Sequence, residues 1–236
     1  MAKHANALVV MAKAPLPGAV KTRLVPPLSP EEAADLYRAL LLDLLESLGS
    51  FRGADRFIAF TPAEAAPLFN DMAPLGFVSF PQRGEDLGKK MSHIFEELFT
   101  KGYRNIVLVG SDLPVFPARF LEDAFMALEG SERDLVLGPS RDGGYYLIGM
   151  NRYVPQVFQG IPWSSRSVLS ATVQKLPALG LAPHFIPAWL DIDTPEDLRY
   201  LASLANNLPD RSQRITLGFL NALSAKKIIW SYRREQ

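Results

Sequence analysis

The stretch VVMAKAPLPGAVKTRL, Val9 to Leu24, starts as an apolar run and passes directly into a loop with two prolines. The run is typical of a buried strand. Three cations, Lys13, Lys21 and Arg23, surround the turn that follows. A stiff loop can hold such side chains ready for a phosphate chain, and Arg adds a bidentate fork. The alternative is a surface turn with solvated charges.

The rest of the chain alternates short apolar runs with longer helical patterns, which predicts a mostly parallel sheet with helices on both faces. The runs near Leu135 and Tyr146 are too close for an intervening helix, so the sheet is expected to be mixed there. The predicted strands are 7–12, 56–60, 77–80, 105–110, 134–138, 145–150 and 184–190. The predicted helices are 31–48, 63–69, 87–99, 118–128, 165–176 and 195–204, with a further helical segment at 215–234.

The run IVLVGSDLP, residues 106–114, delivers Asp112 at the carboxyl end of a buried strand. Ligands of open α/β sheets bind at this edge. A carboxylate there suits Mg²⁺ or Mn²⁺ bridging a diphosphate. The alternative is a helix cap, which Pro114 and Pro117 disfavour because they move the next helix start away. A serine hydrolase is disfavoured, because Ser111 lacks the G-x-S-x-G context.

The segment DIDTPEDL, residues 191–198, places Asp191 and Asp193 at alternate positions of an extended chain, hence on one face. Two like charges repel unless a cation joins them, which favours a metal over a structural role. Thr194 and Asp197 fit a capping box for the following helix. We therefore expect Asp112 and the 191–193 pair to meet at one divalent ion.

Two further motifs, GPSRDGGYYLIGM (138–150) and IPWSSRSVL (161–169), combine glycines, aromatic residues and serines. Gly143 and Gly144 allow a close backbone approach or a hairpin turn. Tyr145 and Trp163 could stack on a ring or belong to the core, and the core interpretation is favoured for each alone. Ser164 or Ser165 could bind an anion or cap a helix.

Bulk properties narrow the function classes. The 236 residues contain 25 Lys and Arg against 25 Asp and Glu, so no basic surface indicates nucleic acid as the main partner. The absence of cysteine excludes thiolate metal sites and a cysteine nucleophile. No apolar run approaches the ~20 residues of a membrane span. The chain is expected to be soluble and cytoplasmic, with residues 1–205 as one domain and 206–236 as a linker and helical tail.

Taken together and in this order, KAPLPGAVKTRL, QRGEDLGKKM, LVGSDLP, GPSRDGGYYLIG, IPWSSRSVL and LDIDTPEDL carry a resemblance that runs from about Leu8 to Leu204. The chain resembles a bacterial family of glycosyltransferase-like, nucleotide-diphospho-sugar transferase proteins. It is also similar, more distantly, to 2-phospholactate guanylyltransferase and the molybdenum-cofactor nucleotidyltransferases. The resemblance implies a three-layer α/β/α fold with a mostly parallel mixed sheet, the Rossmann-like GT-A type.

The resemblance also implies site roles. Asp112, Lys21 and Arg23 would be catalytic, and Asp112, Asp191 and Asp193 would hold Mg²⁺ or Mn²⁺. Gly110-Ser111-Asp112 replaces the compact D-x-D of glycosyltransferases, so the second ligand falls to Asp191 or Asp193. The nucleotide would contact Lys13, Pro15, Gly18, Lys21, Arg23, Gln82, Gly84 and Gly88. The acceptor pocket would consist of Asp142, Gly143, Gly144, Tyr145, Trp163, Ser164 and Ser165.

Two reactions fit these residues. A nucleotide-diphospho-sugar transferase acting on a small-molecule acceptor is ranked first. A nucleotidyltransferase, which joins a nucleoside triphosphate to a phosphorylated acceptor and releases pyrophosphate, is ranked second. A non-catalytic nucleotide-binding module is the third alternative. The apolar face of the tail predicts packing on the domain or on a partner subunit, and a basic amphipathic membrane helix is the less favoured alternative.

Overall fold

The computed structural model describes residues 4–130, 133–205 and 214–225 of the chain. In these ranges seven strands form one sheet in the order β3-β2-β1-β4-β6-β5-β7. Only β6 among them runs antiparallel to its neighbours, β4 and β5. This confirms the predicted mostly parallel sheet with a mixed region. The strands are β1 (Asn6–Lys13), β2 (Asp55–Thr61), β3 (Phe77–Pro81), β4 (Asn105–Gly110), β5 (Leu135–Pro139), β6 (Tyr145–Met150) and β7 (Pro183–Phe185).

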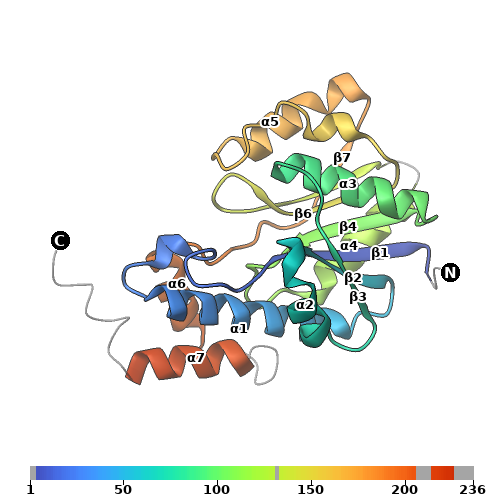
Figure 1. Cartoon of the computed structure of the whole chain (residues 1–236). Helices are drawn as coiled ribbons and strands as arrows, with labels where there is room; N and C mark the ends of the chain where they lie inside the picture. Colours follow the sequence, from blue (N-terminus) through green and yellow to red (C-terminus); the bar gives the residue numbers. More distant parts are fainter. Residues whose placement is uncertain (1–3, 131–132, 206–213, 226–236) are drawn as a thin grey trace.

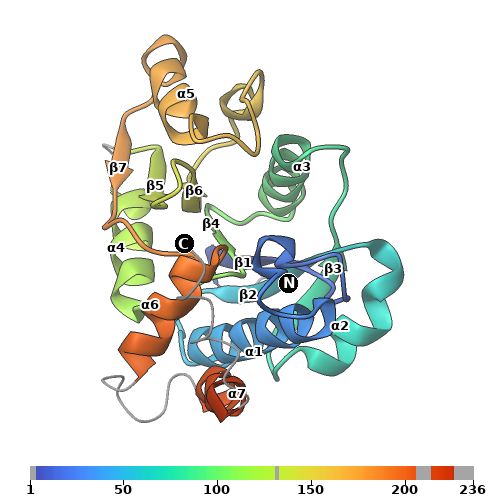
Figure 2. The ribbon, with the colours of Figure 1, turned by 90° about the vertical axis from the view of Figure 1, so that its left-hand side faces the viewer.

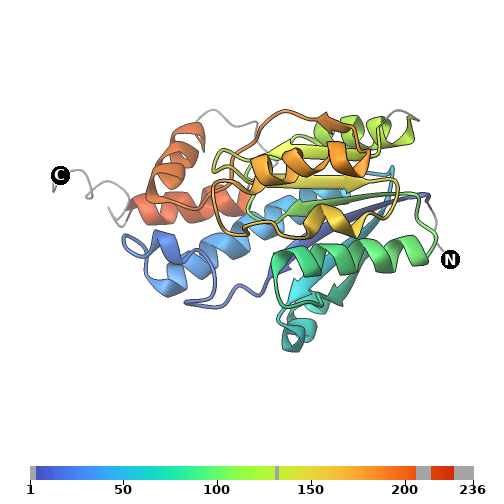
Figure 3. The ribbon, with the colours of Figure 1, turned by 90° about the horizontal axis from the view of Figure 1, so that it is seen from above.

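Helices cover both faces of the sheet, so the fold has the three predicted layers (Figures 1 and 2). One face packs against α1, α2 and α4, and the other against α3, η3 and α5. Seen from above, α3 (green) and α5 (orange) run along the strands (Figure 3). The helices are α1 (Pro30–Gly49), α2 (Ala66–Met72), α3 (Leu87–Thr100), α4 (Ala118–Glu129), α5 (Val168–Lys175), α6 (Pro195–Ala205) and α7 (Arg214–Ala225), with short 3₁₀ turns η1 (Thr22–Leu24), η2 (Ala63–Ala65), η3 (Pro155–Phe158) and η4 (Pro177–Leu179).

Helix α1 is buried on two sides, which explains why apolar residues surround most of it. Leu41 and Leu44 pack against one face of the sheet, whereas Leu36 and Leu40 pack against α6 and α7. Its start is fixed by a capping box, which the run Ser29-Pro30-Glu31-Glu32 predicts from the sequence. The Ser29 hydroxyl accepts a hydrogen bond from the Glu32 backbone, and the Glu32 carboxylate accepts one from Ser29 N.

The tail helix α7 lies against α1 (Figures 1 and 2). Leu220 and Leu223 are 2% exposed and join the apolar cluster of α1 and α6. The buried Asp43 carboxylate of α1 accepts hydrogen bonds from Ile215 N at 3.2 Å and Thr216 N at 2.8 Å. A carboxylate at a helix N-terminus is favoured by the helix dipole. The described tail therefore packs on its own chain. A homo-oligomer formed through the tail stays a prediction.

Several element boundaries differ from those predicted, among them those of β7, α5 and the tail helix. Strand β7 ends at Phe185 rather than Leu190, because Pro187 cannot donate to a strand ladder. Helix α5 begins at Val168 rather than Ser165, because residues 163–167 form turns and Ser167 has a non-helical backbone with φ −102° and ψ 7°. The tail helix was predicted over 215–234, and residues 226–234 lie outside the described part of the chain.

Candidate active site

The two strands that carry the predicted site lie side by side. β1 pairs in parallel with β4, and Met11 is opposite Gly110, so the loop after Lys13 and the loop holding Asp112 leave the same edge of the sheet. The segment before α6 reaches this edge too, because Ile192 N donates to Asp112 O at 3.3 Å. The expectation that Asp112 and the 191–193 segment converge is confirmed.

The centre of this edge is the ammonium of Lys21. Its Nζ lies 3.1 Å from Asp112 Oδ1 and 2.9 Å from Asp193 Oδ1. The Lys21 side chain is only 2% exposed, and its backbone is left-handed, with φ 50°. Burial alone would lower the pKa of Lys21, but the carboxylates of Asp112 and Asp193 outweigh it and raise the pKa above its usual value. Lys21 is therefore a positive charge held at the edge of the sheet, not a solvated one.

The two carboxylates beside Lys21 keep access to solvent. The side chains of Asp112 and Asp193 are 38% and 33% exposed. Asp193 is held in place by the following helix, because Asp193 N and Thr194 N both donate to the Asp197 carboxylate. Asp112 does not cap α4, which begins six residues later after Pro117. The helix-cap alternative for Asp112 is thereby wrong.

Asp191 lies among carboxylates and does not pair with Lys21 directly. Burial, the Asp142 carboxylate and the Asp193 carboxylate together raise the pKa of Asp191 to about 6. A carboxyl in this position is easily protonated and is stabilised in its charged form only when a cation is near. Asp142, expected in the acceptor pocket, is thus electrostatically coupled to the predicted metal residues.

The carboxylates at this edge of the sheet fit a divalent ion that takes most of its ligands from phosphate and water. In the described ranges no group of three or more His, Cys, Asp or Glu side chains is arranged around one metal position. Asp112 and Asp193 nevertheless both form an ion pair with the Lys21 ammonium. Apart from this ion pair, the buried Asp112 Oδ1 has no hydrogen-bond donor among the described residues. Mg²⁺ commonly uses only one or two carboxylates, with phosphate oxygens and water completing its shell. Asp112 and Asp193 fit such a site.

The remaining predicted nucleotide residues surround the same edge. Arg23 is 66% exposed, with Nη1 3.9 Å from Asp193 Oδ2, and Lys13 is exposed as well. The solvated-turn alternative therefore describes these two cations and fails for Lys21. Gln82 Nε2 donates to Ala59 O at 2.7 Å and Ala12 O at 3.3 Å, so it ties the ends of β1 and β2 together. Pro15 and Gly18 lie in the loop, and Gly84 and Gly88 flank the start of α3.

The predicted acceptor residues also come together. Residues 140–144 form a hairpin turn, and a Cβ on Gly143, whose φ is +93°, would fall 2.0 Å from Arg166 O. This close approach joins the hairpin to the 163–167 segment that carries Ser164 and Ser165. Tyr145 and Trp163 meet edge to face, with ring centroids 6.5 Å apart. Both rings also pack against the core on the α3 side of the sheet. The core interpretation and the acceptor-pocket interpretation of these two residues are therefore compatible.

Sequence reasoning missed one residue that supports the site. The buried Tyr37 hydroxyl lies 2.7 Å from Ser111 Oγ and accepts a hydrogen bond from Lys13 N at 2.9 Å. It thus connects the start of the cationic loop to the residue before Asp112. Its helical spacing indicated only a core position, and no local pattern distinguishes a core tyrosine with a positioned hydroxyl from an ordinary one.

Comparison with known proteins shows the family of the chain. A family model described as "Uncharacterized protein conserved in bacteria (DUF2064)" matches residues 44–165. The chain is also 30% identical over 183 residues to 3-phospho-D-glycerate guanylyltransferase from Phenylobacterium zucineum, covering 75% of this chain and 81% of that one. The chain belongs to the DUF2064 family. The resemblance stated from the motifs is confirmed.

Other relatives extend the comparison. Phosphoenolpyruvate guanylyltransferase from Sphaerobacter thermophilus is 28% identical over 189 residues, covering 78% of this chain and 87% of that one. A Desulfovibrio desulfuricans structure named as a nucleotide-diphospho-sugar transferase is 34% identical with a TM-score of 0.87, covering 97% of this chain and 98% of that one. A Leptospira borgpetersenii cytidylyltransferase, 12% identical with a TM-score of 0.59 and 99% coverage of both chains, shows the fold alone.

These relatives identify the protein as an enzyme of the transferase class with a nucleotidyltransferase-type fold. A purely non-catalytic binding module is thereby overturned. The resemblance was expected to end near Leu204, but the 97% coverage by the Desulfovibrio structure carries it into the tail. None of the helices in the described ranges has the length and apolarity that a membrane crossing requires.

Proposed function

We propose that the protein is a metal-dependent nucleotidyltransferase that joins a nucleoside triphosphate to a phosphorylated acceptor. The observation that carries this proposal is the Lys21 ammonium between the Asp112 and Asp193 carboxylates, at the carboxyl edge of adjacent parallel strands. A cation and two carboxylates at this edge suit a triphosphate with its divalent ion. Guanylyl transfer by the relatives from Phenylobacterium and Sphaerobacter supports the same reaction class and makes GTP the first nucleotide to test.

In the proposed reaction an oxygen of the acceptor phosphate attacks the α-phosphorus of the triphosphate. The bond from the α-phosphorus to the bridging oxygen breaks, and pyrophosphate leaves with the electron pair. When bound, a divalent ion would neutralise the charge that develops on the phosphate oxygens. Asp112 and Asp193 would hold it. Arg23, exposed and only weakly paired with Asp193, is free to turn its guanidinium toward the phosphates.

Lys21 has a different role from the one expected for a simple phosphate-binding lysine. Without nucleotide it neutralises the two carboxylates, which would otherwise repel each other. With nucleotide and metal bound, its ammonium can donate to a phosphate oxygen while remaining near Asp112. The Tyr37 hydroxyl fixes both the start of the loop and Ser111, so these groups keep their positions during the exchange.

The proposal is tested by pyrophosphate release from GTP with Mg²⁺ and a panel of phosphorylated acceptors. Asp112→Asn and Asp193→Asn should each lower the rate by at least ~100-fold, the scale of losing one group that stabilises transition-state charge. Asp35→Asn, on the exposed side of α1, is the matched control and should keep the wild-type rate. Pyrophosphate release that continues in both site variants would remove these residues from the proposal.

A second candidate is transfer of a sugar from a nucleotide-diphospho-sugar. It is favoured by the 34% identity and the TM-score of 0.87 with the Desulfovibrio structure of that name. The two reactions differ in their products, because sugar transfer releases a nucleoside diphosphate and nucleotidyl transfer releases pyrophosphate. Incubation with a nucleotide-sugar panel and detection of the released diphosphate decides between them.

A further inference from the structure

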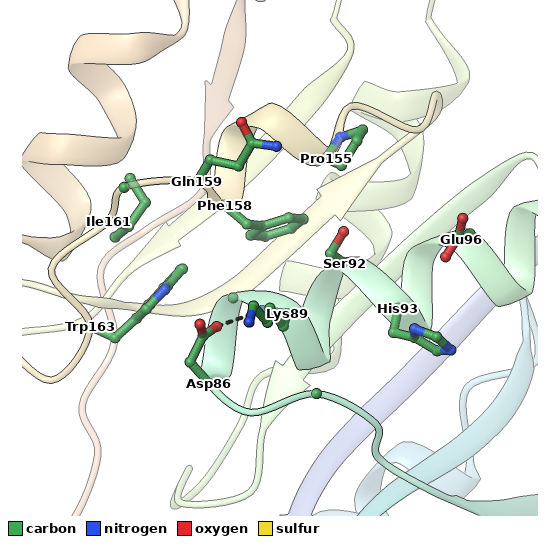
Figure 4. Close-up of a pocket in the computed structure, with 13 residues that line it drawn as sticks. Asp86, Lys89, Ser92, His93, Glu96, Pro155, Phe158, Gln159, Ile161 and Trp163 are labelled. Carbon is green, nitrogen blue, oxygen red and sulfur yellow. Dashed lines mark hydrogen bonds between the residues drawn. The ribbon is translucent and has the colours of Figure 1, made fainter.

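A cavity of about 590 Å³ lies between α3 and the segment that runs from η3 to Trp163 (Figure 4). Cavities of ~300–1,000 Å³ are typical of small-molecule sites. Asp86 and Trp163 stand at one end and His93 and Glu96 at the other, with Phe158 between them (Figure 4). Only three of the residues that line this cavity, Gly84, Gly88 and Trp163, were expected from the sequence to contact substrate. The full lining is Gly84, Asp86, Gly88, Lys89, Ser92, His93, Glu96, Pro155, Phe158, Gln159, Gly160, Ile161 and Trp163.

Trp163 connects this cavity to the candidate active site. Its indole ring packs on the first turn of α3, where a Cβ on Gly88 would fall 2.7 Å from the ring. On its other side it meets Tyr145, the first residue of β6 after the 140–144 hairpin. Trp163 thus borders both the predicted acceptor residues and the cavity. A substrate group that extends from the predicted acceptor residues into the cavity would therefore lie beside the indole ring of Trp163.

The cavity offers hydrogen-bonding groups that the described part of the chain leaves without a partner. Within the described residues, the side chains of His93, Glu96 and Gln159 and the indole N–H of Trp163 have no hydrogen bond or ion pair. An imidazole, a carboxylate, an amide and an indole N–H beside the aromatic ring of Phe158 suit a ring that carries several hydroxyl groups. Its C–H face can lie on an aromatic surface while its hydroxyls exchange hydrogen bonds with the polar groups.

The charge of the lining argues against an acidic occupant. Asp86 and Glu96 contribute two carboxylates against the single ammonium of Lys89. That ammonium is already paired with Glu85, one turn earlier. A carboxylate placed here would meet like charge without a free lysine or arginine of the lining to neutralise it. A neutral, hydroxyl-bearing body fits where a phosphorylated carboxylic acid does not.

We infer that the acceptor of this enzyme is a sugar phosphate whose ring occupies the cavity along α3. The inference rests on the proposed nucleotidyl transfer. The sugar's phosphate oxygen bonds to the α-phosphorus of the nucleotide, the α–β bridge breaks, and the products are a nucleotide-diphospho-sugar and pyrophosphate. The acceptors named for the guanylyltransferase relatives are small phosphorylated acids, so the cavity predicts a difference in substrate from these relatives.

The experiment measures pyrophosphate release by the full chain with GTP, Mg²⁺ and one acceptor at a time. The panel contains hexose 1-phosphates and 6-phosphates on one side and 3-phosphoglycerate and phosphoenolpyruvate on the other. We expect kcat/KM for at least one hexose phosphate to exceed that for both acids by about tenfold or more, the scale of one well-placed contact. Turnover of the acids with every hexose phosphate inert would overturn the inference and leave the proposed function standing.

Two variants test the cavity itself. Trp163→Ala and Glu96→Gln should each raise KM for the hexose phosphate by about threefold to tenfold while KM for GTP stays unchanged. Glu96 is exposed, so its substitution leaves the fold intact; Glu122→Gln, exposed on α4 across the sheet, is the control. An unchanged KM in both variants would overturn the inference.

If no acceptor releases pyrophosphate, the proposed function fails, and calorimetric titration with the hexose phosphates still tests the cavity. Binding that is weakened by Glu96→Gln supports it, and no binding at millimolar concentration refutes it.

Discussion

Replacing Lys21 with methionine would leave the carboxylates of Asp112 and Asp193 facing each other with no cation between them. The lysine side chain is 2% exposed and its Nζ is 3.1 Å and 2.9 Å from the two carboxylates. Methionine has a similar length and the same cost in the left-handed backbone, so the substitution removes charge more than shape. The free energy of unfolding should therefore report the loss of the two ion pairs.

The size of the effect follows from burial. Removing one partner of a fully buried pair costs about 3–5 kcal/mol. Here the carboxylates are 38% and 33% exposed, so water screens part of the repulsion, and about 2 kcal/mol is expected. For a protein of 236 residues this lowers Tm by about 4–8 °C. Mg²⁺ can then replace the lost ammonium. At ten times its Kd, Mg²⁺ should raise the free energy of unfolding of the Lys21→Met variant by about 1.4 kcal/mol.

Thermal unfolding in EDTA and in Mg²⁺ measures both quantities. Lys13→Met, an exposed position of the same loop, is the matched control and should show neither the loss nor the rescue. The reasoning is refuted if Lys21→Met unfolds at the wild-type temperature in EDTA. Equal stabilisation of wild type and variant by Mg²⁺ would separately refute competition between Lys21 and the metal for these carboxylates.

Three further predictions concern single charged side chains. Arg23→Ala, which removes a cation beside Asp193, should weaken GTP binding in Mg²⁺ by about 1.5–3 kcal/mol, and unchanged calorimetric affinity would contradict the proposed phosphate contact. Because folding raises the pKa of Asp191 to about 6, its charge destabilises the fold above that pH. Asp191→Asn should raise the free energy of unfolding by about 1–2 kcal/mol at pH 8 and hardly at all at pH 4, as denaturant titration at both pH values would show. Asp43→Ala should lower the free energy of unfolding by about 2–3 kcal/mol, because it removes the two hydrogen bonds to α7. The same substitution in a chain that ends at Leu208 should cause no such loss.

The sequence predicted the fold well because its local signals agree with one another. The apolar runs were long enough to identify each strand, and the Ser29–Glu32 and Thr194–Asp197 capping boxes located two helix starts. The convergence of Asp112 with Asp193 was predictable as well, because strand ends of a parallel sheet meet at one edge.

Other parts of the site depend on packing between distant segments and could not be predicted. Lys21 is buried because the segment before α6 covers the loop, and nothing in residues 13–23 indicates that contact. The cavity beside α3 forms only where η3 and Trp163 approach it, and Gly88 matters because a ring from 75 residues later packs on it. The hydroxyl of Tyr37 gains its role from Ser111, a neighbour in space alone.

The central claim, that this enzyme transfers a nucleotidyl group, is tested most directly by following the phosphates of the nucleotide. GTP labelled on the α-phosphate is incubated with the wild-type enzyme, Mg²⁺ and the acceptor panel, and the products are separated. The account predicts that the α-label appears in a new compound joined to the acceptor phosphate, with one pyrophosphate released for each. Label that stays in GTP while a nucleotide-sugar donor yields nucleoside diphosphate would contradict it.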